Sequence, residues 1–468
     1  MKDNRALLWP AALLLFSFVL QAGFVMEQRG TAPTKFFRSN SAFDSSRFIG
    51  DARIIENEGF LPATKKIATH PVYPLLIAAF DKAFGDDSLA FLFFQCLLNC
   101  ASFALVFYIA HKLFGYATAL VALAACALYG PFVLYAAVYL REGAVMLLSL
   151  SVVALFLSAD KKPGYSAMAA AGAVAALLML TRPYPLSILA IVALLAFNIL
   201  QNRGKKDVIR MGTFLAGYAA ITLLVPGPEN IDPTGPLAHF LSGNVLDSGY
   251  GYIWLSTPIK ERILAESHGS SVAGISLLLK EIAAHPYGYS LFYAKKLRML
   301  VGDFEIPSNY NFYLFRDELS RILWIPFLSF GLAAPFSFLG IWAARHKWRD
   351  ALPLYLWLAI SSFGVFIFLI QDRYRISLAP FFIIFAAHGA QRLYDTVKQG
   401  QRKKAFAYMA ALATAFYFCR FDYTPLAGAI TAEDYVNLEM AYHLSGDDQN
   451  AKFFAKKIVL LKQGIPAH

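Results

Sequence analysis

The chain has 468 residues, of which 58% are hydrophobic, 15% aromatic and only 16% charged. A soluble domain cannot bury that much apolar surface, so the composition predicts an integral membrane protein. The net charge is +11, but the Lys and Arg residues lie in short loops between apolar runs, and no basic–aromatic module or zinc-finger spacing is present. Anionic lipid and the positive-inside rule account for this pattern, so we expect the lipid bilayer, and no nucleic acid, as a partner.

The first apolar run, near residues 6–25, follows Lys2 and Arg5. It is longer than the core of a signal peptide and no clear A-x-A site follows it, so we expect an uncleaved signal anchor. A spanning helix needs roughly 20 apolar residues, and about eleven such runs predict an all-α polytopic membrane protein. The other ten expected spans lie near residues 89–111, 116–138, 143–159, 165–181, 184–200, 211–226, 322–344, 351–370, 376–393 and 404–419.

The Lys and Arg residues of the short connections predict the orientation. With the N-terminus in the cytoplasm, one set of connections holds seventeen of these residues and the opposite set only four. Because positive charge is retained on the cytoplasmic side, we expect the N-terminus there. Two long segments, residues 26–88 and 227–321, and the tail after Arg420 then lie on the outer face.

Four arginines on the outer face break this rule, namely Arg141, Arg182, Arg373 and Arg375. They stand at the mouths of helices, where a cation usually has an anionic partner, and we interpret them as binding an anionic ligand. Headgroup contact, or pairing with local acids such as Glu142 and Asp372, is the alternative. The pair Lys295–Lys296 in the second outer segment is expected to face solvent or headgroups.

The first outer segment is predicted to contain two helices at the membrane surface. Residues 44–58 place Asp44 and Asp51 seven apart, so the two carboxylates project from nearly the same face, and Gly59 ends this helix. The stretch "HPVYPLLIAAFDKAFG" reads as a second, interfacial helix. Asp44 could instead be only a helix N-cap, as could Ser41.

Several landmarks occur together in an order that resembles one enzyme superfamily. They are Asp44, Phe48 and Ala52, then "EGF", "HPVYPLL", "FQCLLNCASFALVFYIAHKLFG", "YLREGAVMLLSL" and "QDRYRISLAPFFIIFAA". This order resembles the GT-C glycosyltransferases, and is closest to the family-39 branch with the protein O-mannosyltransferases and the lipid A aminoarabinose transferase. The resemblance covers roughly residues 6–395 and implies a GT-C-like fold.

The resemblance also implies roles for the acidic residues. An acid at the position of Asp44 is the catalytic or metal-associated carboxylate of that family, and Glu142 matches a glutamate at the start of the fourth helix. Many relatives have a second acid where this chain has Ser45. That departure leaves Asp51 or Glu142 as the second carboxylate. It also leaves open whether the site holds a divalent metal ion, for which Asp44 and Glu142 would be the ligands.

Members of this superfamily transfer a sugar, with inversion, from a polyprenyl phosphate to an acceptor on the outer face. Such a reaction needs a carboxylate that accepts the acceptor's proton, and we expect Asp44 to be this base, supported by Asp51 and Glu142. It also needs cations for the departing lipid phosphate, and the planar guanidinium suits phosphate. Arg373 and Arg375 are the first candidates for that role, followed by Arg182 and Arg141.

The sequence divides into a transmembrane domain, residues 1–420, and a tail, residues 421–468. Within the tail "AEDYVNLEMAYHLSGDDQNAKFFAKKIVLLKQGIP" resembles a single tetratricopeptide repeat. A lone repeat is not stable by itself, so we expect a helix hairpin packed on the membrane domain.

The same sequence features also fit other functions. A lipid or solute transporter or flippase would also use many helices and outer arginines, although transporters place their sites near the midplane between repeats. A glycan ligase or polymerase would use a similar outer site, and an interaction scaffold could use the tail. The acceptor could be a lipid, a glycan or a protein, and compact loops favour a bacterial inner membrane and an undecaprenyl donor.

Overall fold

The computed structural model describes residues 3–86, 89–159, 164–182, 205–225, 235–248, 256–420 and 430–463, together with six positions between 189 and 196. Within these residues the regular structure is helical, and β-type pairing is limited to one isolated bridge between Tyr129 and Leu328. The predicted all-α class is therefore confirmed for the described chain. The expected span near residues 184–200 falls mostly outside the described residues.

The apolar runs fold into helices close to the expected positions. These are α1 (Asp3–Gln28), α6 (Leu89–Phe114), α9 (Glu142–Ser158), α10 (Tyr165–Thr181), α12 (Lys205–Leu224), α18 (Phe330–Ala344), α19 (Leu352–Ile367), α21 (Ala379–Lys398) and α22 (Arg402–Cys419). The span expected over residues 116–138 is instead divided into α7 (Tyr116–Ala127) and α8 (Gly130–Ala136). The division falls just before Pro131, which cannot donate a backbone hydrogen bond to a continuous helix.

Only three described helices are long and apolar enough to cross a membrane by length and composition. They are Leu7–Gln28, Leu89–Phe114 and Lys206–Leu224, and four shorter apolar helices accompany them. Helix α19 has 16 residues, so at about 1.5 Å per residue it is shorter than a hydrocarbon core of about 30 Å. The expected number of about eleven spans is therefore not confirmed.

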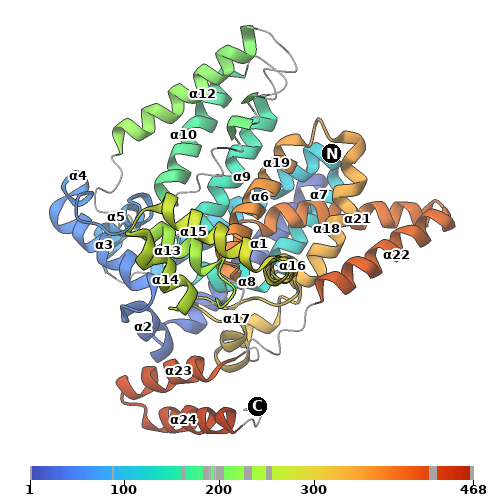
Figure 1. Cartoon of the computed structure of the whole chain (residues 1–468). Coiled ribbons are helices and arrows are strands. Elements are labelled where there is room, and N and C mark those ends of the chain that lie inside the picture. Colours follow the sequence, from blue (N-terminus) through green and yellow to red (C-terminus); the bar gives the residue numbers. More distant parts are fainter. Residues whose placement is uncertain are drawn as a thin grey trace.

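Glycines allow two helix pairs to approach closely in the bundle (Figure 1). A Cβ added at Gly340 of α18 would lie 1.8 Å from the carbonyl oxygen of Phe385 in α21. A Cβ at Gly172 of α10 would lie 2.0 Å from the Phe214 oxygen in α12. Small residues at such contacts let helix backbones meet, as is common between membrane helices.

The first outer segment forms four helices: α2 (Ala32–Ser39), α3 (Asp44–Glu58), α4 (Phe60–Ala63) and α5 (Val72–Phe84). The predicted helix over residues 44–58 is confirmed, and it ends at Gly59, whose φ of 81° favours glycine. Phe48, Ala52 and Ile55 form its buried stripe and α3 packs against α5. Asp44 thus stands at the start of a helix anchored along its length.

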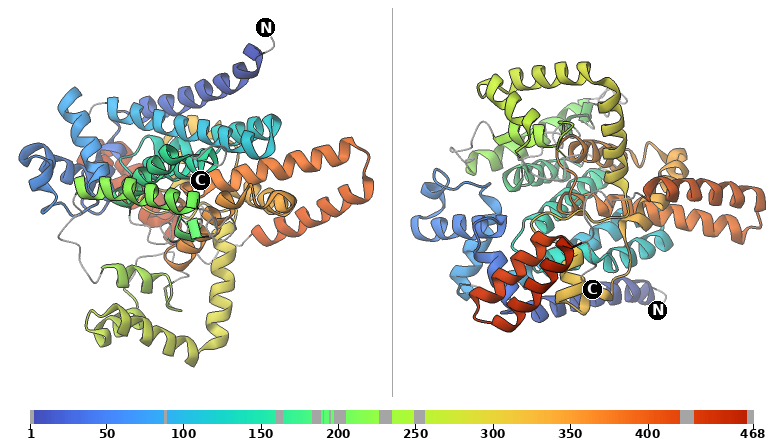
Figure 2. Two further views of the ribbon diagram at one scale, coloured as in Figure 1. Left: turned by 90° about the horizontal axis from the view of Figure 1, so that it is seen from above. Right: turned by 60° about the horizontal axis from the view of Figure 1, so that its bottom comes forward.

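The second outer segment has its own small core. Leu237, Leu241, Ile263, Leu278 and Phe292 are buried together. Helices α13 (Gly235–Ser242), α14 (Pro258–Ser267) and α15 (Ser271–Ala284) are set apart from the bundle, and α16 (Pro286–Val301) connects them to it (Figure 2).

Lys296 of α16 is fully buried, so its expected solvent- or headgroup-facing position is wrong. Its ammonium group donates to the carbonyl of Phe368 at 3.0 Å and to the carbonyl of Gly243. These carbonyls follow the ends of α19 and α13 and lack helical partners. Lys296 therefore ties the second outer segment to the bundle, and burial lowers its pKa to about 7.

The C-terminal tail forms a hairpin of α23 (Ala432–Leu444) and α24 (Asp448–Lys462), joined through Gly446. The hairpin packs on the rest of the chain as expected. The Glu318 carboxylate accepts from Tyr435 Oη at 2.8 Å and from Lys457 Nζ at 2.6 Å, and Asn311 donates to Asp434 at 2.8 Å. Its tetratricopeptide character stays a prediction.

Candidate active site

Four of the predicted site residues lie at the ends of helices and meet at one end of the bundle. Asp44 begins α3 and Glu142 begins α9, while Arg182 caps the C-terminus of α10. Arg373 lies in α20 (Asp372–Ile376), a short helix between α19 and α21. Helix ends carry unpaired backbone groups and therefore face polar surroundings, which places these charges at a polar site beside apolar helices.

Arg373 connects the acids of two separate segments. Its Nη1 donates to Asp44 Oδ2 at 2.6 Å and to Asn309 Oδ1 at 2.9 Å, while Nε donates to Glu142 Oε1 at 3.2 Å. The side chain is only 6% exposed. A guanidinium can hold three acceptors at once because its donors are fixed in a planar fork.

Glu142 is fully buried between two arginines. Its Oε1 also accepts from Arg182 Nη1 at 3.1 Å, and Arg182 stacks 4.4 Å from the Tyr374 ring centroid. The other oxygen, Oε2, has no hydrogen-bond partner among the described residues. Glu142 therefore orients Arg182 and Arg373 through a single oxygen, Oε1.

Arg141 adds a third cation beside this pair of acids. It donates to the Thr181 carbonyl at 2.9 Å and its guanidinium lies 5.3 Å from the Phe48 ring centroid. Burial, then the charge of Arg182, lowers its pKa to about 10, and its Nε has no partner among the described residues. Three arginines thus face two carboxylates, so the site carries an excess of positive charge.

The electrostatics keep Asp44 ionised. Burial acts to raise the pKa of this carboxyl, but Arg373, with smaller effects of Arg141 and Arg47, lowers it to about 2. Its side chain is 30% exposed. The helix has Phe43 at its N-cap position and no side-chain cap bond, so capping does not explain Asp44.

Asp51 does not join the cluster. Its carboxylate accepts from the backbone N–H of Ala68 at 3.2 Å and of Thr69 at 2.9 Å, and from the Thr69 hydroxyl. Seven residues advance about 10 Å along a helix, so Asp51 lies two turns from Asp44 although the two share a face. The structure gives Asp51 a role in holding the connection between α4 and α5, away from the site where it was predicted to act.

Arg375 is also separate from the cluster. It is fully buried, pairs with Glu305 Oε2 at 2.6 Å, and donates to the carbonyls of Gly302, at 2.8 Å, and Phe304. Tyr129 Oη donates to the other Glu305 oxygen at 2.8 Å. Side chains two apart on a helix do not face the same way. Arg375 therefore anchors residues 302–305, away from the cluster where it was predicted to bind phosphate.

Two neighbouring side chains were not predicted as site residues. Asn309 contacts Arg373, and the next residue, Tyr310, shares a 2.8 Å hydrogen bond with Ser45. Asp372 accepts from Tyr135 Oη at 2.7 Å and from the Arg373 N–H at 2.6 Å, and burial raises its pKa to about 8. The sequence offered a signal for Asp372, because it is an acid next to an outer arginine. It offered none for Asn309, whose contact with Arg373 depends on the fold.

His239 places the second outer segment beside the same site. Burial lowers its pKa to about 4, and the charges of Asp44 and Arg373 are both close enough to affect it. Helix α13, which carries the exposed His239, therefore lies on the same side of the molecule as the cluster.

The described residues do not fit a metal ion at this site. They contain no group of three or more His, Cys, Asp or Glu side chains arranged to hold one. Asp44 and Glu142, the suggested ligands, both accept from the same guanidinium. Hard divalent ions take several oxygen ligands, so we assign no step to a metal.

Residues 68–227 match the family described as dolichyl-phosphate-mannose-protein mannosyltransferase. This GT-C family match confirms the predicted resemblance over a stretch that includes Arg141, Glu142 and Arg182. No curated protein matches the chain.

Solved structures that resemble this chain include the oligosaccharyltransferase of Archaeoglobus fulgidus. Its complex with an inhibitory peptide and a dolichol-phosphate is 15% identical, with a TM-score of 0.49, over 96% of this chain and 55% of that one. The apo form is 12% identical, with a TM-score of 0.47, over 95% and 56%. The chain thus spans just over half the length of these proteins.

Proposed function

We propose that this protein transfers a sugar, with inversion, from a polyprenyl-phosphate donor to an acceptor at the site of Asp44. The observation that carries the proposal is the meeting of two buried arginines, Arg182 and Arg373, a partly buried one, Arg141, and two carboxylates at helix mouths. The family match supports glycosyl transfer in general terms. The excess of Lys and Arg in the opposite loops favours placing this site on the outer face.

In this proposal the arginines bind the donor phosphate. Arg141 and Arg182 hold cationic groups beside Arg373, and a guanidinium binds phosphate oxygens in a bidentate manner. In the structure Arg373 is neutralised by Asp44 and Glu142. The donor phosphate would replace a carboxylate in some of the hydrogen bonds that Arg373 donates, because it is a competing anion in a site that already carries excess positive charge.

This competition would activate Asp44. A carboxylate with a pKa near 2 is a weak base, and the ion pair with Arg373 is the largest effect that lowers this pKa. When Arg373 turns to the phosphate, that effect weakens and the pKa of Asp44 rises. Donor binding thereby prepares the base.

The transfer step then balances within these residues. The acceptor oxygen attacks the anomeric carbon from the face opposite the phosphate, and its proton passes to Asp44. The bond between that carbon and the phosphate oxygen breaks, and its electron pair stays on the lipid phosphate. Arg373, Arg182 and Arg141 stabilise the developing charge. Attack opposite the leaving group inverts the anomeric centre.

The structure favours this proposal over a transporter. Helices α1, α6 and α9 hold their charged residues only near their ends, and α10 contains none. Transporters usually place their sites near the midplane, whereas this cluster lies at helix mouths. A glycan ligase or polymerase would use the same cluster. A set of labelled donors distinguishes those two activities from the transfer of a single hexose or pentose.

The test uses purified full-length protein with labelled polyprenyl-phosphate sugars and extracted envelope acceptors. We expect wild type to consume one donor, and Asp44→Asn to lose about 100-fold or more in turnover, which is the usual contribution of a general base. Glu56→Gln is the matched control, since Glu56 is exposed on the same helix. Equal turnover by Asp44→Asn and wild type, at equal stability, would rule out Asp44 as the base. Binding of no donor would favour the transporter.

A further inference from the structure

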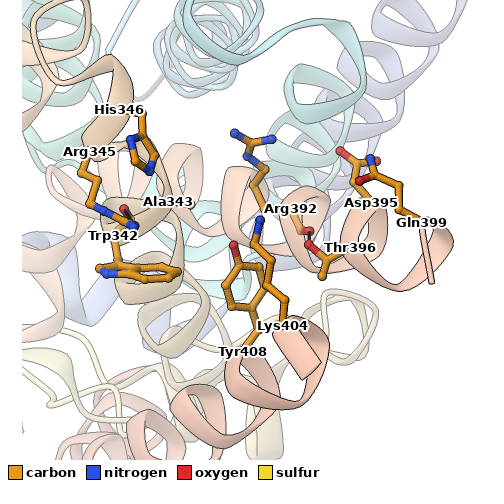
Figure 3. A pocket seen from close by; sticks show the side chains of 10 residues that line it. All are labelled: Trp342, Ala343, Arg345, His346, Arg392, Asp395, Thr396, Gln399, Lys404 and Tyr408. Carbon is orange, nitrogen blue, oxygen red and sulfur yellow. Dashed lines mark hydrogen bonds between the residues drawn. The ribbon is translucent and has the colours of Figure 1, made fainter. Parts of the chain in front are cut away.

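A second polar cavity lies at the opposite end of the bundle. A cavity of about 110 Å³ opens between the ends of α18, α21 and α22 (Figure 3). It is lined by Trp342, Ala343, Arg345, His346, Arg392, Asp395, Thr396, Gln399, Lys404 and Tyr408. Helix α21 starts just after α20, and Asp395 lies 16 residues further, about 24 Å along the axis. This cavity is therefore distinct from the candidate active site.

An adjoining cavity of about 180 Å³ extends the 110 Å³ cavity toward α7. The two share Ala343, His346, Arg392 and Asp395, and the second is also lined by Phe114, Thr118, Lys347 and His388. We call the two together the inner cavity. Its combined size admits a polar headgroup rather than a single water.

Positive charge dominates the mouth of the inner cavity. Lys347, Arg392 and Lys404 have no ion-pair partner within the described part of the chain. Arg392 from α21 and Lys404 from α22 both line the cavity (Figure 3). The single carboxylate, Asp395, accepts instead from Gln391 at 2.9 Å. The cations therefore outnumber the one carboxylate in the lining, and this excess of positive charge favours an anion.

Two buried polar side chains line the wall of the inner cavity. Thr118 is 1% exposed and its hydroxyl has no hydrogen-bond partner among the described residues. His388 is 8% exposed, stacks on Phe114 with ring centroids 4.1 Å apart, and its Nδ1 is likewise unpartnered among those residues. Buried polar groups are nearly always hydrogen-bonded, so both groups indicate that a polar molecule belongs here.

We propose that the inner cavity binds a phosphate-bearing anion, namely the glycerophosphate headgroup of an anionic phospholipid. Arg392, Lys347 and Lys404 would contact the phosphate, and Thr118 and His388 would bond the headgroup hydroxyls. Trp342 and Tyr408 border the cavity, as aromatic residues do at membrane interfaces. Basic pockets between helix ends suit lipid phosphates. The inference is independent of the proposed transferase activity.

The test measures lipid binding to the full-length protein by native mass spectrometry, with phosphatidylglycerol and, for comparison, zwitterionic phosphatidylcholine. We expect the double variant Lys347→Gln, Arg392→Gln to bind phosphatidylglycerol about tenfold or more weakly, since each substitution removes a charge-assisted contact to the lipid phosphate inside the cavity. The control double variant Arg402→Gln, Lys403→Gln makes the same charge change on exposed residues that do not line the cavity. It should change binding less than twofold.

Two further arms decide between sources and mechanisms. Thr118→Val removes only the buried hydroxyl and should weaken phosphatidylglycerol binding several-fold. If millimolar inorganic phosphate or glycerol 3-phosphate competes with bound lipid, and the protein does not prefer phosphatidylglycerol to phosphatidylcholine, the cavity is a phosphate site. That result would overturn the lipid as its occupant. Equal losses in both double variants would overturn the proposal, because the attraction would then be a general surface effect. Thermal unfolding of each variant shows that the comparison is made on folded protein.

Discussion

Single residues with similar sequence contexts have different roles in this molecule. Arg373 and Arg375 are two positions apart, yet Arg373 faces Asp44 and Glu142 whereas Arg375 is enclosed with Glu305. Both are buried cations, so burial alone does not separate a site residue from a structural one. The difference is that the Asp44 cluster is partly open and carries excess positive charge, while Arg375 is matched by one acid and two carbonyls.

Matched lysine variants test this difference. We expect Arg373→Lys to lower kcat/KM about 100-fold, because one ammonium group cannot span the three acceptors or bind phosphate in a bidentate manner. Arg375→Lys should lower the unfolding temperature but leave kcat/KM per folded molecule within about threefold of wild type. Steady-state kinetics and thermal unfolding of both variants measure these effects. The reverse pattern would exchange the roles that we assign.

Asp372 gives the fold a pH dependence with a definite sign. Burial raises its pKa to about 8 in the folded protein, while the unfolded chain has an ordinary value near 4. Between these values the unfolded state releases a proton that the folded state keeps, so stability falls as pH rises from about 4 to 8. Asp372→Asn should remove this fall, since the amide still accepts from Tyr135. Unfolding midpoints at pH 5 and pH 8.5 measure it, and an unchanged slope in the variant would refute it.

At the scale of elements, helix ends rather than helix middles carry the chemistry. Helices α3 and α9 begin with acids, and α10 ends with an arginine. Helix α20, which carries Arg373, directly precedes α21, and α21 packs closely against α18. That closeness depends on glycine, because backbone atoms occupy the space of the missing side chain.

Gly340→Ala tests the dependence on that helix pair. The new Cβ would lie 1.8 Å from the Phe385 carbonyl oxygen, so the helices must separate, and overpacking of this kind costs about 1–3 kcal/mol. Gly212→Ala in α12 is the control, since nothing lies within 4 Å of its added Cβ and alanine favours helix by about 1 kcal/mol. The first variant should unfold at lower temperature and the second at the same or higher temperature. Equal midpoints would show that α18 and α21 adjust without cost.

At the scale of the whole molecule, the two polar regions lie at opposite ends of the bundle. One holds the Asp44 cluster with both outer segments, and the other holds the inner cavity. The hairpin of α23 and α24 docks at Glu318 and Asn311, two residues from Asn309. A transferase with this arrangement would receive donor and acceptor on one face only.

Single cysteines test the orientation. We expect a membrane-impermeant maleimide to label Glu56→Cys and Asp448→Cys in intact cells stripped of their outer envelope, and to label Lys403→Cys only after the membrane is opened. All three positions are exposed, and of the four native cysteines three are buried and one is partly buried. Labelling in the opposite order would reverse the topology and move the active site to the cytoplasmic face.

The sequence by itself determined the helical class, most helix positions, the bounds of α3 and the gathering of charge at helix mouths. These follow from local quantities, namely runs of apolar residues, glycine at a helix end and the placement of Lys and Arg. Such signals need no knowledge of distant contacts. Asp44, Glu142, Arg182 and Arg373 were therefore candidates before any fold was known.

Only the tertiary structure decided which of the charged residues meet. It separated Asp51 from the cluster by two helical turns, enclosed Arg375 with Glu305, brought in Asn309 and buried Lys296. Each outcome depends on contacts between residues 17 to 72 positions apart in the sequence, which composition and periodicity do not encode. The division between α7 and α8 and the shortness of α19 likewise depend on how neighbouring helices pack, which is why a count of apolar runs did not establish a count of spans.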